Sequence, residues 1–155
     1  METPVRRRFM SLLAAMASMI ALPLLRVRAA HAQSDPFAAL VLQITGGAPV
    51  RSGRVTVDTP RLSDNGHSVP LKVSVESPMT AADHVRRITL LSERNPRPVM
   101  ATFHLGPQAG RAEVTTRVRL NGTQRLLVLA QFSDGSYWSG DAEVEVTESA
   151  CLDAS

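Results

Sequence analysis

The chain has one cysteine, Cys151, among its 155 residues. A single cysteine excludes an internal disulfide, a c-type haem attachment motif, which needs two thiols, and a zinc site built from several thiolates. In an exported protein, one leftover thiol indicates either pairing with another chain or deliberate reactivity. The position of this thiol, with four residues after it, therefore needs a functional explanation.

The chain without residues 1–32 also has no excess of basic over acidic residues. Residues 1–32 hold five of the 17 Lys and Arg residues and one of the 14 Asp and Glu residues. The remaining 12 basic and 13 acidic residues give a formal net charge of −1. No nucleic-acid footprint and no patch for anionic membranes is predicted from this charge balance.

No apolar run is long enough to predict a permanent membrane helix. The N-terminal run starts after three arginines at 6–8 and is interrupted at Pro23. The segment VRRRFMSLLAAMASMIALPLL resembles a bacterial twin-arginine export signal. Ala30 and Ala32 are the small residues that a signal peptidase reads, so residues 1–32 are predicted to be a signal peptide cleaved after Ala32. This predicts a periplasmic protein, and an uncleaved anchor is the alternative.

Residues 34–47 predict one short helix. Ser34 or Asp35 can cap its start, and Pro36 suits the first helical position. Gly46-Gly47 is expected to end it. The apolar residues follow the i, i+3, i+4, i+7 spacing, namely Phe37, Leu40, Val41 and Ile44. Because a helix this short is unstable alone, its apolar stripe must pack against the rest of the domain.

After this helix, apolar and polar residues alternate with a period of two. About seven such runs predict strands, at 55–57, 69–75, 88–90, 99–105, 112–120, 124–132 and 142–146. The run at 124–132 is apolar on both faces, which is typical of a central strand. Turns are predicted at three dipeptides, the first and last of hairpin type, namely Asn65-Gly66, Asn121-Gly122 and Asp134-Gly135. The pattern predicts an all-β sandwich of two sheets within residues 33–147.

The histidines of the exported part show no metal-ligand spacing. His67, His84 and His104 are far apart in the sequence and are interpreted as solvated or structural. No metal and no cofactor is therefore predicted. A metal chaperone that uses Met79, Met100 and His104 is disfavoured for the same reason.

Other chemistry-bearing residues also lack the context of an active site. Glu143 and Glu145 can do acid–base work as a pair, but they alternate with apolar residues and are interpreted as a solvated strand face. No serine stands in a nucleophile elbow. Arg117 and Arg119 either cover a sheet face or pair with a partner protein. The sequence therefore predicts a protein that is not an enzyme.

Residues 148–155 are predicted to form a C-terminal arm. They show no periodicity and are mostly small or polar, which is typical of a mobile tail. A thiol on a tail reaches places that a thiol on a strand cannot. Because exposed thiols outside the cell are prone to oxidation, we favour a functional Cys151 over an incidental cysteine at a frayed terminus.

Ordered blocks between about Phe37 and Thr147 resemble SoxY, the sulfur-carrier subunit of the bacterial thiosulfate-oxidising Sox system. They read NG.SVP, SPMT..D, NP.P..ATF, TRVRL.GTQ and DGSYW. The resemblance implies an immunoglobulin-like sandwich that forms a heterodimer with SoxZ. It also implies that Cys151, on a swinging arm, holds sulfur intermediates covalently while Sox-type cytochrome and hydrolase partners act on them.

The arm departs from the usual Gly-Gly-Cys-Gly-Gly of that family. Ser149-Ala150 precede the cysteine and Leu152-Asp153 follow it, which is closer to a divergent group with Ala-Ala-Cys-Ile-Glu. Leu152 adds bulk, and negative charge near the sulfur comes from Glu148, Asp153 and the terminal carboxylate. This charge disfavours the thiolate and repels anionic thiosulfate, so the cargo and its loading enzyme do not transfer from the family.

Two classes of function therefore remain at the level of the sequence. The first is a covalent carrier of sulfur intermediates on Cys151. The second is a non-catalytic accessory subunit of another periplasmic oxidoreductase complex, with Cys151 vestigial or in an inter-chain disulfide.

Overall fold

The computed structural model describes residues 35–149 of the chain, and residues 1–34 and 150–155 lie outside the described part. The predicted signal peptide, its cleavage after Ala32 and the thiol of Cys151 fall outside it as well. Within residues 35–149, no helix is long and apolar enough to cross a membrane.

The predicted short helix is present as α2 (Pro36–Thr45). The Asp35 carboxylate caps it by accepting a hydrogen bond from the Phe37 N–H at 3.0 Å, and Pro36 takes the first position. Gly46 ends the helix with a φ of 64°, a left-handed conformation that glycine adopts without a steric cost. The cap and stop residues are those that the sequence indicates.

The rest of the described chain forms nine strands and one turn of 3₁₀ helix. The elements are β1 (Val50–Ser52), β2 (Val55–Asp58), β3 (Leu62–Asn65), β4 (Val69–Val75), β5 (Val85–Ser92), β6 (Val99–His104), η1 (Pro107–Ala109), β7 (Ala112–Val118), β8 (Gln124–Phe132) and β9 (Tyr137–Glu148).

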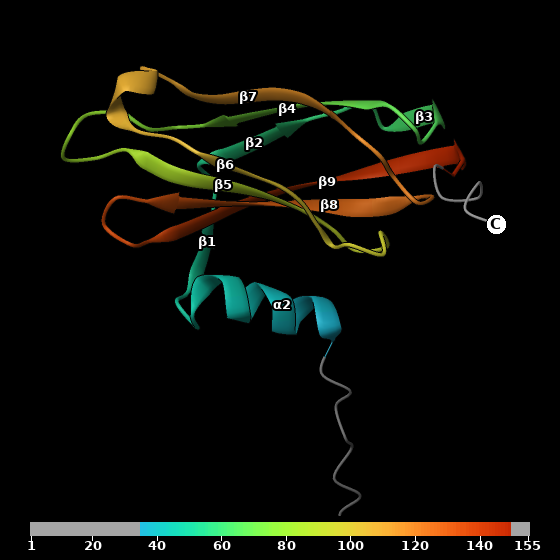
Figure 1. The fold of residues 1–155 in the computed structure, drawn as a ribbon, viewed down its shortest axis with the longest axis horizontal. Helices are drawn as coiled ribbons and strands as arrows, with labels where there is room; N and C mark the ends of the chain where they lie inside the picture. The colour runs from blue at the N-terminus through green and yellow to red at the C-terminus, as the bar shows by residue number, and fades with distance from the viewer. Residues whose placement is uncertain (1–34, 150–155) are drawn as a thin grey trace, which may run out of the picture. The chain divides into compact units, whose positions relative to one another are not determined.

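The strands form two sheets packed face to face (Figure 1). The larger has the order β1-β9-β8-β5-β6, with β3 also paired to β9, and the smaller has the order β2-β4-β7. α2 lies beneath the larger sheet, on the side away from the smaller one (Figure 1). This is the predicted sandwich, and β8 is central, between β5 and β9, as its apolar faces indicate.

The core lies between the sheets and is apolar. Val69, Leu71 and Val73 of β4 face Ile88 and Leu90 of β5, and all are at most 1 % exposed. Burying a side chain of this size contributes about 1.5–3 kcal/mol, so packing can hold the sheets together without a disulfide. Leu91 and Leu129 are also buried but lie outside this cluster.

Strand β9 organises the larger sheet. It pairs antiparallel with β8 over residues 137–144, and parallel with β1 at its start and with β3 at its end. Gly140 is required in its middle, because a Cβ there would lie 2.4 Å from the carbonyl oxygen of Val55 in β2. This close approach holds an edge of the smaller sheet against β9.

The structure differs from the sequence predictions in strand number and in one turn. β1 and β3 were not predicted, because they are short, mostly exposed and pair with β9 mainly through backbone groups. Asn65-Gly66 does turn the chain, but β3 pairs with β9 rather than β4, so the predicted hairpin is wrong. Asp134-Gly135 does close the β8–β9 hairpin, and hydrogen bonds from the Ser136 hydroxyl and N–H lower the pKa of Asp134.

Candidate functional site: the root of the C-terminal arm

The last residues of β9 are held by hydrogen bonds from two directions. The Gly66 N–H donates to the Glu148 carbonyl at 2.8 Å, and the Thr147 hydroxyl donates to the Asp64 carbonyl at 2.9 Å. The Val146 N–H donates to the Thr123 hydroxyl at 3.0 Å. The strand therefore continues to Glu148, slightly beyond its predicted end near residues 146–147.

Ser149 extends this attachment by one more residue. Its hydroxyl donates a 2.6 Å hydrogen bond to the side-chain oxygen of Asn121, in the β7–β8 turn. The backbone of Asn121 is itself fixed, since its N–H donates to the side-chain oxygen of Asn95 at 2.9 Å. We call Glu148 and Ser149, with the groups that bind them, the arm root.

A buried polar network supports the arm root from inside. Ser92 and Gln124 are 0 % and 4 % exposed, and the Ser92 hydroxyl donates to the Gln124 side-chain oxygen. The Gln124 amide donates to the Asn95 side-chain oxygen at 3.1 Å, and the Asn95 amide donates to the Arg119 carbonyl at 2.8 Å. Every buried side-chain nitrogen or oxygen of the described residues has a partner. A fully satisfied network of this kind fixes the geometry of the groups attached to it.

The arm root is the last described part of the chain before the cysteine. Ser149 is the last residue that the structure describes, and Cys151 follows it by two residues in the sequence.

We expect the Asn121–Ser149 hydrogen bond to stabilise the arm root by about 0.5–1.5 kcal/mol. A double-mutant cycle with Asn121→Ala and Ser149→Ala, measured by urea unfolding, isolates their coupling energy. Hydrogen exchange at residues 146–149 should also rise in Asn121→Ala, because the end of β9 opens more often. A coupling energy of zero with unchanged exchange would show that this bond does not hold the arm root.

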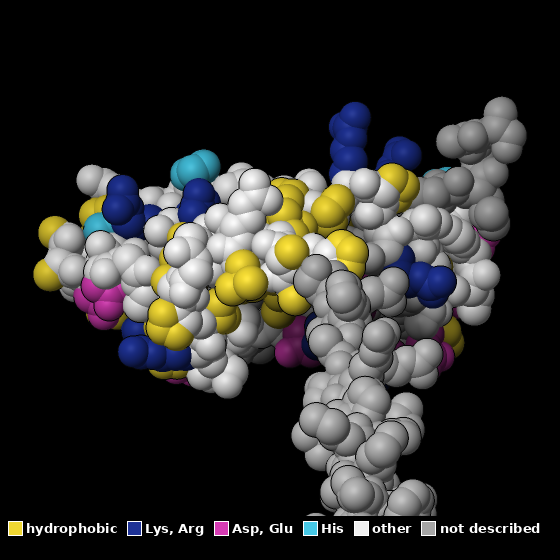
Figure 2. Space-filling model, turned by 90° about the horizontal axis from the view of Figure 1, so that it is seen from below, with side chains coloured by type: hydrophobic (Ala, Val, Ile, Leu, Met, Phe, Trp, Pro, Cys, Tyr) yellow, Lys and Arg dark blue, Asp and Glu magenta, His cyan; other side chains and the backbone are white. Residues whose placement is uncertain are grey.

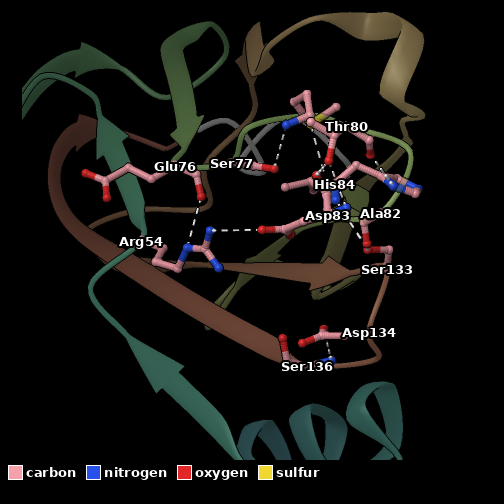
Figure 3. Close-up of polar contacts among 12 residues, drawn as sticks. Arg54, Glu76, Ser77, Thr80, Ala82, Asp83, His84, Ser133, Asp134 and Ser136 are labelled. Atoms are coloured by element: carbon pink, nitrogen blue, oxygen red, sulfur yellow. Dashed lines mark hydrogen bonds and ion pairs between the residues drawn. The ribbon is translucent and has the colours of Figure 1, made fainter.

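The three histidines lie apart and do not form a site. His84 lies in the β4–β5 loop (Figure 3). Its ring Nδ1 is 3.0 Å from the Thr80 carbonyl oxygen, and its backbone N–H donates to the Ser133 hydroxyl. The N–H of His67 donates to the side-chain oxygen of Asn65. His104 is exposed on β6. Within residues 35–149, no group of three or more His, Cys, Asp or Glu side chains could hold a metal ion.

The β4–β5 loop has a structural explanation (Figure 3). Arg54 donates to the Glu76 carbonyl at 3.0 Å, lies 4.0 Å from the Asp83 carboxylate and stacks 4.3 Å above the Phe132 ring. Met79 is buried and adopts a φ of 49°, which costs a non-glycine residue some free energy. These contacts close the end of the sandwich opposite the arm root.

The paired carboxylates and Arg117 have structural explanations that do not involve the arm root. Glu143 and Glu145 line a polar pocket of about 510 Å³ together with Asp141 and Arg61. This is a solvated strand face, as the alternation indicates. Arg117 donates to the Ser68 carbonyl and hydroxyl, so its side chain lies over the smaller sheet.

Comparison with known families identifies the chain. The family model described as sulfur oxidation protein SoxY matches residues 41–151. This match covers most of the chain and runs to the cysteine itself. The chain belongs to the SoxY family. The resemblance carried by the sequence blocks is thereby confirmed.

A solved SoxY structure has the same fold as this chain. The sulfur carrier protein SoxY from Chlorobium limicola f thiosulfatophilum is 25% identical, with a TM-score of 0.61, over 72% of this chain and 96% of that one. A superoxide reductase (neelaredoxin) from Ignicoccus hospitalis is 20% identical, with a TM-score of 0.54, over 60% of this chain and 79% of that one. The second likeness shows the sandwich fold alone. No curated protein matches the SoxY chain described here.

The sequence singles out Cys151, but it does not predict the hydrogen-bond network of the arm root. Gln124 opens an apolar strand, and Asn95 lies outside the predicted strands, so neither stands out as part of a network. A signal was present: a polar residue at the first position of a buried strand needs a hydrogen-bond partner. Its partners Ser92 and Asn95 lie 32 and 29 residues away in the sequence, so the tertiary fold decides which groups it meets.

Proposed function

We propose that this SoxY-family chain is a periplasmic carrier that holds sulfur intermediates covalently on Cys151. The observation that carries the proposal is the family match that reaches residue 151, the position of the only thiol. The arm root adds support, because hydrogen bonds attach the chain firmly up to Ser149, two residues before Cys151 in the sequence. The named function of the Chlorobium limicola relative, sulfur carrier, is of the same kind.

The chemistry of the carrier requires a partner. Joining a thiol to a sulfur oxyanion such as thiosulfate through a new S–S bond releases two electrons and the thiol proton. The proton goes to water, and a haem-containing partner of the Sox cytochrome type would accept the electrons. A hydrolase partner would later remove the oxidised sulfur as sulfate. In this scheme the chain supplies the nucleophile and its position, and the partners supply the catalysis.

The proposal includes export and pairing. Residues 1–32 would direct the folded chain through the twin-arginine pathway, with cleavage after Ala32. A SoxZ-like subunit would form the heterodimer. Apolar surface is available for a partner, since Leu42 of α2 is 60% exposed and Val99 of β6 is 41% exposed. Co-purification from the native periplasm would name this subunit.

Intact-mass analysis of the protein purified from its native periplasm tests the carrier function. When the cells have been supplied with a sulfur substrate, we expect the protein to show mass increases that correspond to added sulfur, or to added sulfur and oxygen. A thiol reductant should remove them, because they are joined through an S–S bond. If the protein shows only a free thiol or a simple dimer disulfide on every sulfur substrate tested, the proposal is wrong.

A further inference from the structure

A second polar site lies at the other end of β5 from the arm root. A pocket of about 400 Å³ is lined by Arg86, Arg87, His104, Leu105 and Gln131. Arg87 is five residues from Ser92 of the buried network, which corresponds to about 17 Å along a strand. Figure 2 shows histidine and basic side chains close together toward one end of the face that carries α2. We call this pocket the basic pocket.

The register of three strands brings its side chains together. Gln131 of β8 pairs with Arg87 of β5, and Arg87 pairs with His104 of β6, so the three form one cross-strand row. The pairing of β5 with β8 shifts between Val85 and Arg87. This bulge inserts Arg86 as an extra residue, which allows two consecutive arginines to line the same pocket.

The Arg87 guanidinium is positioned by a neutral group. It donates to the Tyr137 hydroxyl at 3.2 Å, and that hydroxyl donates to the Ile44 carbonyl of α2 at 3.2 Å. Tyr137 is 6% exposed, so its ring is held in place. Because this partner is a neutral hydroxyl and not a carboxylate, it does not neutralise the positive charge of Arg87, which can attract an anionic ligand.

Within the described part of the chain, no acidic side chain pairs with these basic side chains. The lining of the basic pocket contains no Asp or Glu, and none of the ion pairs among residues 35–149 involves Arg86, Arg87 or His104. Arg86 and Arg87 are consecutive residues that line the same pocket, so two positive charges lie close together there. A bound anion would offset the repulsion between them.

We propose that the basic pocket binds a small tetrahedral oxyanion of the sulfate or sulfonate class. The planar fork of an arginine matches two oxygens of such a group, and Gln131 can donate a further hydrogen bond. Leu105 adds an apolar side chain to the lining. The proposal rests on the pocket alone and does not require Cys151 to carry sulfur.

A titration followed by NMR tests this binding. Sodium sulfate is added to the ¹⁵N-labelled protein, and sodium chloride at matched ionic strength serves as the reference for charge screening. We expect saturable shifts of the amides of residues 86, 87, 104 and 131 with sulfate and not with chloride. Arg87→Ala should weaken sulfate binding about tenfold or more, since it removes a charged hydrogen-bond donor.

Two further variants make the result decisive. Arg111→Ala removes an exposed arginine outside the basic pocket, so it changes the net charge equally and should leave sulfate affinity unchanged. Arg86→Gln should also weaken sulfate binding. Because the Arg86 side chain is exposed, this variant should stay folded, and it serves as the test if Arg87→Ala unfolds the domain. Equal responses to sulfate and chloride, or equal losses in the Arg111 and pocket variants, would overturn the proposal.

Discussion

Cys151→Ser is expected to abolish sulfur carrying while the sandwich stays folded. The substitution replaces the only thiol with a hydroxyl, which forms no S–S bond, so the loss should be complete rather than graded. Cys151 follows the last buried residue of the described core, Val144, by seven residues in the sequence, so we expect the thermal unfolding midpoint to change little. The measurements are sulfur-dependent growth or oxidation in the native host, with circular dichroism and co-purification of the partner as controls.

The outcome separates the two functions that the sequence left open. Loss of sulfur oxidation with an intact partner complex supports a carrier. Undiminished sulfur oxidation in Cys151→Ser would favour the accessory subunit, in which the cysteine is vestigial. An inter-chain disulfide would appear instead as a band that non-reducing electrophoresis shows for the wild type and not for the variant.

Gly66→Ala is expected to destabilise the domain and to displace the arm root. A Cβ at this position would lie 2.5 Å from the Leu120 carbonyl oxygen and 2.9 Å from the Glu148 carbonyl oxygen. Both are backbone atoms of residues that are hydrogen-bonded to Gly66: the Glu148 carbonyl accepts from the Gly66 N–H, and the Leu120 N–H donates to the Gly66 carbonyl. Moving either oxygen away would therefore strain one of these bonds. Overpacking of this kind costs about 1–3 kcal/mol. That corresponds to a fall in the unfolding midpoint on the order of 10 °C.

Gly106→Ala is the matched control. Its Cβ would meet only the flexible end of the Gln108 side chain, and its φ of −140° is open to any residue. We expect a change of less than about 0.5 kcal/mol, of either sign. Alkylation of Cys151 should change in rate in the Gly66 variant and not in the control. Equal stability of the two variants would contradict the role given to Gly66.

Much of the fold could be predicted because its signals are local. The cap and stop of α2 depend on Asp35, Pro36 and Gly46, all within a few residues of the helix ends. The central position of β8 follows from a run that is apolar on both faces. Each of these features depends on the properties of one segment, and sequence reasoning treats one segment at a time.

The features that were missed depend on pairing between distant segments. β3 exists because Leu62–Asn65 lies parallel to the end of β9, and nothing in its four residues indicates that partner. The same is true of the bond between Ser149 and Asn121, 28 residues apart in the sequence. Cys151 stands out in the sequence because it is the single cysteine, and its role stays a prediction. The hydrogen bonds that hold residues 146–149 could not be predicted, because the tertiary fold assembles them.

The most direct test of the carrier is mass spectrometry of the C-terminal peptide during turnover of the assembled complex. The sulfur substrate is given as a pulse, and samples are quenched as it is consumed. The account predicts that an S–S-linked adduct appears on Cys151 within the pulse and disappears as oxidised sulfur is released. A Cys151 that stays unmodified while the complex oxidises its substrate would contradict it.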